Sequence, residues 1–135
     1  MPDSILVNRL LRHYNPFHFL FGKDLEELPE KYFQAEPIEF APAWDRSSRR
    51  DYDKRRIVHF IHKLRRGEPI DPIELDNDII GKATWGPPII TDGHHRACAA
   101  IIVKRRRVEC EYSGLLKTLK WRKGEGRMDS PPFSY

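Results

Sequence analysis

The 135-residue sequence contains only two cysteines, Cys98 and Cys110, and neither stands in a paired motif. A disulfide framework or a cysteine-rich zinc module is therefore not expected, and both thiols are predicted to be buried in ordinary packing. Long apolar runs are also missing, since none approaches the roughly 18–20 residues that cross a bilayer. The first residues, MPDSILVNRLLRHY, lack the basic-then-apolar order of a secretory signal. These absences predict a cytoplasmic protein without a membrane partner.

An acidic excess is absent as well, because 24 Lys and Arg stand against 20 Asp and Glu, a formal net charge of +4. The positive charge is concentrated in the segments 46–56, 62–66 and 104–107. Clustered Lys and Arg favour an anionic partner such as a nucleotide or nucleic acid. Solvated helix faces and turns have the same composition, so charge alone leaves both interpretations open.

The spacing of apolar residues predicts both helices and strands. Helical spacing appears over 4–14, with Ser4 as an N-cap, over 50–66, which Gly67 ends, over 94–105 and over 114–124. Strands are predicted at 36–40, around Ile73 and Leu75, at 88–91 and at 107–113. The predicted class is α+β: a compact domain over 36–123 with a small mixed sheet flanked by helices. A helical N-terminal extension over 1–35 and a tail over 124–135 complete the chain.

A polar corner, Thr-Asp-Gly-His-His-Arg at 91–96, joins the predicted strand 88–91 to the following helix. Unpaired N–H groups at a helix start favour anions, and Gly93 allows a positive φ. Arg96 suits a phosphate because its planar guanidinium binds two oxygens at once, and His94 and His95 add donors. Asp92 has three possible roles: helix cap, proton acceptor or Mg²⁺ ligand. An anion site is favoured over a metal site because adjacent histidines diverge on a helix, while a purely structural turn stays open.

The segment PPIITDGHHRACAAIIVKRRRVECEY, with RRIVHFIHKLRRGEPIDPIELDN upstream, resembles the ParB/sulfiredoxin superfamily over about 36–112. The corner of ParB proteins reads Gly-Glu-Arg-Arg, that of sulfiredoxin Gly-Cys-His-Arg, and that of the free serine kinases Asp-Gly-x-His-Arg. The kinase form is closest to this sequence. The resemblance implies that Gly93, His95 and Arg96 hold a phosphate and that Asp92 is the acid of the kinase-like versions. His94 stands where sulfiredoxin has its cysteine, so reduction of sulfinic acid is not expected.

The resemblance extends to residues outside the corner. Glu39 is the nearest match to a general base near the first strand, although a solvent-facing strand glutamate is the simpler interpretation. Arg46 and Arg49 lie where family members complete the phosphate pocket, or form part of a solvated charge run. The Glu-Asn motif and the helix-turn-helix of ParB proteins are not found after residue 112. A plasmid-partition clamp is therefore not expected.

The predicted function is a ParB-like nucleotide- or phosphate-binding domain. Its ligand or substrate is a nucleoside triphosphate with Mg²⁺ held by Asp92. NTP hydrolysis, phosphoryl transfer and phosphodiester cleavage are the candidate reactions, with Asp92, His94, His95 and Glu39 as candidate catalytic residues. Whether the protein is an enzyme stays open. Two alternatives also stay open: a non-catalytic DNA-binding or regulatory module that uses the basic helix faces, and a protein-interaction factor whose aromatic N-terminal segment contacts a partner or forms a homodimer.

Overall fold

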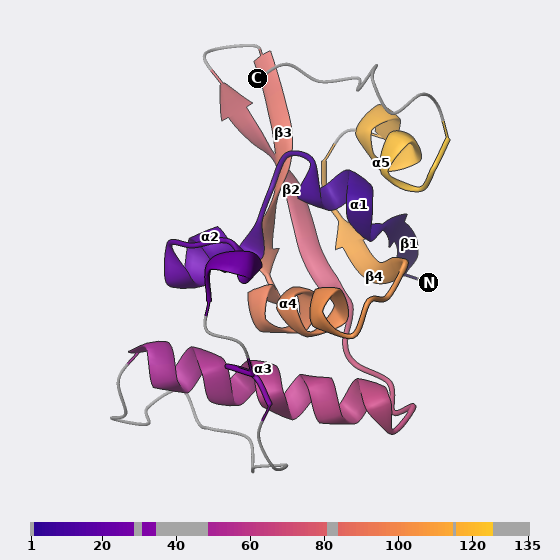
Figure 1. Cartoon of the computed structure of the whole chain (residues 1–135). Coiled ribbons are helices and arrows are strands. Elements are labelled where there is room, and N and C mark those ends of the chain that lie inside the picture. Colours follow the sequence, from indigo (N-terminus) through magenta and orange to yellow (C-terminus); the bar gives the residue numbers. More distant parts are fainter. Residues whose placement is uncertain (1, 29–30, 35–48, 81–83, 115, 126–135) are drawn as a thin grey trace. The chain divides into compact units, whose positions relative to one another are not determined.

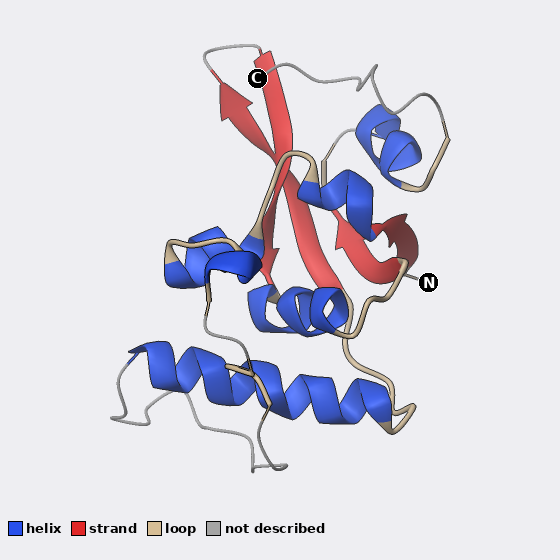
Figure 2. Ribbon diagram, in the orientation of Figure 1, coloured by secondary structure: helices blue, strands red, loops and turns tan. Residues whose placement is uncertain are grey.

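The computed structural model describes residues 2–28, 31–34, 49–80, 84–114 and 116–125. These residues form a mixed α+β structure with helices and one small, open four-stranded sheet, which confirms the predicted class (Figures 1 and 2). They belong to two compact units. The sheet unit comprises residues 1–15, 71–93 and 105–135, and the helical unit comprises residues 16–70 and 94–104.

The sheet unit contains the strands β1 (Asp3–Leu6), β2 (Ile73–Ile80), β3 (Thr84–Asp92) and β4 (Arg107–Tyr112). Their order across the sheet is β1-β4-β2-β3, so β4 lies between β1 and β2 (Figure 1). Strand β4 is antiparallel to β1 and parallel to β2, whereas β2 and β3 pair in antiparallel fashion. The alternation predicted for β4 is confirmed, because Val108 and Cys110 are buried while Arg107, Glu109 and Glu111 are exposed.

The N-terminal helix predicted over 4–14 is wrong at residues 4–6 and ends earlier than predicted, at Leu11. Residues Asp3–Leu6 form β1, and only Val7–Leu11 form the helix α1, which follows Leu6 rather than an Ser4 cap. Ile5 is fully buried and pairs with Val108 of β4. Pairing with β4 supplies the backbone hydrogen bonds of this segment. The segment is too short for the spacing of its apolar residues to distinguish a strand from a helix. The N-terminal segment is therefore not wholly helical.

Other predicted boundaries fall beyond the described part of the chain. The strand predicted at 36–40 and the domain boundary at residue 35 lie within 35–48, outside the described residues, and the tail over 124–135 is described only at Gly124 and Glu125. These bounds stay predictions.

The helical unit contains α2 (Pro16–Phe21), the 3-10 helix η1 (Leu25–Glu27), α3 (Arg49–Arg65) and α4 (His94–Ile102). Helix α3 confirms the prediction over 50–66, and Gly67 follows its last turn as the expected terminating residue. Gly67 has φ +75°, its N–H donates to the carbonyl of Leu64, and the N–H of Glu68 donates to the carbonyl of Lys63. This pair of bonds is the Schellman motif, in which a left-handed residue satisfies the last carbonyls of a helix.

The core of the helical unit joins aromatic side chains to the small residues of α4. Its buried members are Phe17, Phe21, Phe33, Ile57, Val58, Phe60, Ile61, Cys98 and Ala99. Small residues on α4 allow its backbone to approach α3 closely, and the two helices pack against each other. Cys98 and Cys110 are both buried thiols, as predicted, and burial raises the pKa of Cys98 well above its ordinary value and that of Cys110 to about 12.

A cationic group surrounds Trp121 in the sheet unit. Trp121 belongs to α5 (Leu116–Arg122), is 2% exposed, and its carbonyl accepts a hydrogen bond from the guanidinium of Arg9. The His13 ring lies 5.7 Å from the Trp121 ring, measured between centroids. Burial, followed by the charges of Arg122 and Arg12, lowers the pKa of His13 from 6.5 to about 4. His13 is therefore neutral in the folded protein at neutral pH.

This environment predicts acid sensitivity that depends on His13. The unfolded chain takes up a proton at this histidine near pH 6.5, whereas the folded chain does so only near pH 4. The contribution of neutral His13 is therefore complete above pH 6.5 and is lost as the pH falls toward 4. We expect His13→Asn to reduce the loss of unfolding free energy between these two pH values, measured by urea denaturation. Equal profiles for wild type and His13→Asn would contradict the assignment.

Candidate functional site

The strand-corner-helix arrangement predicted for residues 88–96 is confirmed. Strand β3 ends at Asp92, Gly93 is buried with φ +97°, and α4 begins at His94. A side chain rarely adopts this φ, so glycine is the residue that this bend requires. The first turn of α4 contains no acidic residue, and Arg96, its third residue, is partly exposed. No side chain of this first turn therefore neutralises the positive end of the helix dipole.

His95 is held by a carboxylate that the sequence did not indicate as a site residue. Its Nε2 lies 2.8 Å from Oδ1 of Asp53, which α3 places inside the helical unit with only 1% exposure. The His95 side chain is itself 16% exposed, and the Tyr52 ring packs edge-on against it with 6.0 Å between centroids. Asp53 therefore fixes the orientation of the imidazole.

This pair has a defined proton chemistry. A carboxylate beside Nε2 favours a proton on that nitrogen, so the neutral ring has its lone pair on Nδ1. When Nδ1 takes up a proton, the adjacent carboxylate stabilises the imidazolium that forms. The arrangement suits His95 to accept a proton from a bound group or, when charged, to neutralise an anion.

His94 points to a different partner. Its ring stacks on Phe19 of α2 with 4.0 Å between centroids and 13° between planes. Consecutive residues of a helix are turned by about 100°, so His94 contacts α2 while His95 contacts α3. The two imidazoles diverge, as expected from the sequence. Among the residues that the structure describes, no group of three or more His, Cys, Asp or Glu is arranged to hold a metal ion.

Asp92 lies in a row of carboxylates on the sheet. Glu74 of β2 pairs with Asp92 of β3 on one side and with Glu111 of β4 on the other. All three residues are exposed, and directly paired residues point to the same face of a sheet. Three like charges in neighbouring positions repel one another and attract cations. Mg²⁺ binding by Asp92 stays a prediction.

The remaining predicted site residues are not placed. Glu39 and Arg46 lie outside the described residues, and Arg49 is described only as the first residue of α3. Their roles at the site stay predictions.

The burial of Asp53 could have been predicted from its spacing to apolar residues. It precedes the buried residues Ile57 and Ile61 by four and eight positions, so it lies on the apolar stripe of α3. A carboxylate on such a stripe needs a polar partner, because burying an unpaired charge is costly. The interpretation of 50–56 as part of a charged run concealed that Asp53 is buried, whereas Lys54, Arg55 and Arg56 are partly exposed.

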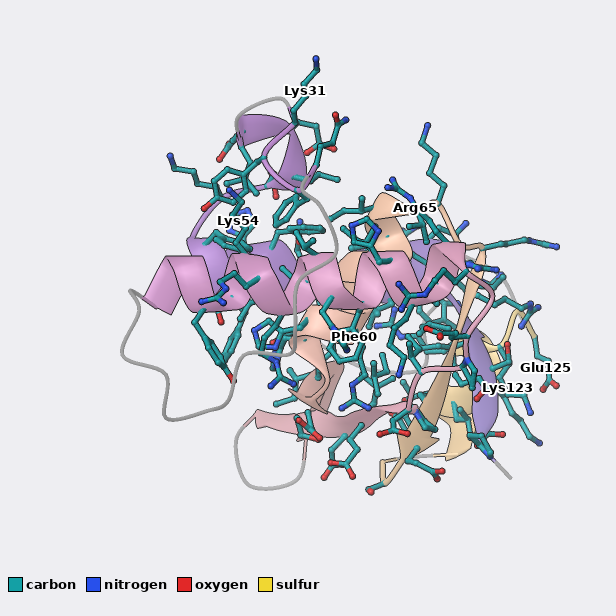
Figure 3. The ribbon with its side chains drawn as sticks, turned by 90° about the horizontal axis from the view of Figure 1, so that it is seen from below. Lys31, Lys54, Phe60, Arg65, Lys123 and Glu125 are labelled. Carbon is teal, nitrogen blue, oxygen red and sulfur yellow. The ribbon has the colours of Figure 1, made fainter. Side chains whose placement is uncertain are left out.

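A cavity of the helical unit lies away from the corner. It is a cavity of about 510 Å³ whose lining includes Leu25, Lys31, Tyr32, Arg65 and Ile102. Lys54 lies over the Tyr32 ring, 4.6 Å from its centroid, and Lys31, Lys54 and Arg65 are labelled in Figure 3. The cavity contains none of the residues 92–96 and is separate from the His95–Asp53 pair.

No protein-family model, curated protein or solved structure matches the chain. Within the described residues, no helix is both long enough and apolar enough to cross a membrane.

The burial of Asp53 predicts strong coupling between Asp53 and His95. In a double-mutant cycle with Asp53→Ala and His95→Ala, we expect a coupling free energy of at least about 1.5 kcal/mol, because a hydrogen bond to a charged group is involved. Urea denaturation of the four proteins measures it. The exposed pair Arg66–Glu68 has the same 2.8 Å separation and is the control, for which solvent screening should leave a much smaller coupling. Similar couplings for the two pairs would show that burial of Asp53 contributes nothing.

Proposed function

We propose that the protein is a nucleotide-binding domain of the ParB/sulfiredoxin type, which binds phosphate at the start of α4. The observation that carries the proposal is the pairing of buried Asp53 with His95 in the first turn of that helix. The N–H groups of this turn, the guanidinium of Arg96 and the imidazole of His95 are the proposed anion ligands. Mg²⁺ accompanies the triphosphate, with Asp92 as its proposed ligand.

The order of the elements supports this assignment. Between residues 49 and 112 the chain forms α3, β2, β3, α4 and β4. This is the order of helix, strand, strand, corner, helix and strand that the sequence resemblance implies. The resemblance also places glycine at position 93, where the backbone has a positive φ.

The chemistry proposed for the site is proton transfer beside a bound phosphate. Phosphoryl transfer depends mainly on charge neutralisation and on the position of the attacking group. Arg96 and the helix start supply the first, and His95, oriented by Asp53, exchanges a proton with the attacking hydroxyl or water. Hydrolysis and transfer to an acceptor use the same residues, so the acceptor distinguishes them.

A basic helix surface favours a second candidate, a nucleic-acid-binding module. On α3 the described basic residues are Lys54, Arg55, Arg56, Lys63 and Arg65, whereas Asp53 on the same helix is buried. Arg56 is partly used in packing, since it lies over the rings of Tyr52 and Phe60. The third alternative was a partner surface made of the N-terminal aromatic residues. It is less favoured because Phe17, Phe21 and Phe33 are buried in the core and cannot contact a partner.

The two functions respond differently to one substitution. We expect ATP with Mg²⁺ to raise the melting temperature of the wild-type protein and to give a calorimetric binding signal. Arg96→Ala should weaken this binding at least about tenfold, because a charge-assisted contact to phosphate is lost. Arg66→Ala, a change at an exposed arginine of the helical unit, is the matched control and should bind like wild type.

Duplex DNA is the competing ligand in the same experiment. Binding to DNA that falls steeply with salt, is indifferent to Arg96→Ala and occurs without nucleotide binding would favour the second candidate. A turnover assay for phosphate release with His95→Gln follows, because binding alone does not establish catalysis.

A further inference from the structure

Phe19 is an exception among the aromatic residues of the helical unit. Its neighbours on α2, Phe17 and Phe21, are 1% and 5% exposed, whereas Phe19 is 63% exposed. It is the exposed large hydrophobic residue of the described part of the chain. A single exposed phenylalanine is ordinary at a protein surface, so its exposure alone indicates no function.

The contact between Phe19 and His94 places this exposed ring next to the start of α4. One face of its ring stacks on His94, nearly parallel, at 4.0 Å between centroids. His94 is the first residue of α4 and directly precedes His95. The ring is thus fixed beside the proposed phosphate site, and its large exposed fraction means that a second planar group has access to it. Fixed aromatic rings with accessible faces bind nucleobases by stacking.

We propose that Phe19 is the base-stacking residue of this site, so that its ligand is a phosphate attached to an aromatic base rather than phosphate alone. This inference rests on the proposed function and names the residue that contacts the base. The base lies against Phe19 while the phosphates reach the first turn of α4 and Arg96. His94 supports the ring from the opposite face.

Three probes separate the contributions of base and phosphate. ATP carries both, tripolyphosphate carries the phosphates alone, and adenosine carries the base alone. A 5′-phosphorylated oligonucleotide tests whether the base belongs to a free nucleotide or to the end of a strand. Binding of each probe to the full chain is measured by calorimetry for wild type, Phe19→Leu and Phe19→Tyr. Phe19→Leu removes the ring but keeps an apolar side chain, and Phe19→Tyr keeps the ring.

We expect Phe19→Leu to bind ATP about tenfold more weakly than wild type, since one base–aromatic stack is lost. Its affinity for tripolyphosphate and its melting temperature should equal those of wild type, because the lost ring is exposed and contacts no phosphate. Phe19→Tyr should bind ATP like wild type. A preference for the oligonucleotide over ATP that also depends on Phe19 would support stacking and assign the base to a strand end.

Two results would overturn the inference, and they differ from failure of the proposed function. If Phe19→Leu binds ATP like wild type while Arg96→Ala loses both ATP and tripolyphosphate, the phosphate site stands without a stacking residue. If Phe19→Leu weakens both probes equally, Phe19 acts only by positioning His94, and the base makes no contact with it. If wild type binds neither ATP nor tripolyphosphate, the proposed function is itself wrong and the inference fails with it.

Discussion

The hydrogen bond between His95 Nε2 and Asp53 Oδ1 is the interaction on which the helical unit and its proposed site both depend. Asp53 is 1% exposed, so its carboxylate has exchanged water for protein contacts. A buried carboxylate without a partner would cost several kcal/mol, whereas a paired one fixes the geometry of its neighbour. The bond joins α3 to the first turn of α4 and thereby orients the imidazole at the helix start.

The packing around this bond explains why it forms where it does. Ala97, Cys98, Ala99 and Ala100 follow the corner and are all buried, so α4 approaches α3 closely enough for a short carboxylate to reach His95. Their small volume leaves room for Ile57 and Ile61 of α3 and for the aromatic residues of α2. Larger residues at these positions would separate the helices and lengthen the contact between Asp53 and His95. The core and the site are therefore consequences of the same close approach.

The sequence predicted the elements with strong local signals. Gly67 ended α3 because a left-handed residue was needed there, and the alternation in 107–112 identified β4 because one face is buried. It did not predict β1, because pairing with β4, a contact distant in sequence, decides the conformation of 3–6. The same limitation hid Asp53 and Phe19, since their importance comes from contacts with α4 that periodicity does not encode. The corner was predictable because its glycine, histidines and arginine are adjacent in the sequence. The residues that contact these histidines are distant in the sequence: Asp53 precedes His95 by 42 positions, and Phe19 precedes His94 by 75.

The most direct test of the account is a map of nuclear magnetic resonance shifts on addition of tripolyphosphate to the full chain. If phosphate binds at the start of α4, the largest changes fall on the amides of His94, His95 and Arg96 and on the His95 ring. Asp53→Asn should reduce them by releasing the imidazole. Changes concentrated on Lys54, Arg55 and Lys63 of α3, with the resonances of His95 unmoved, would contradict the account.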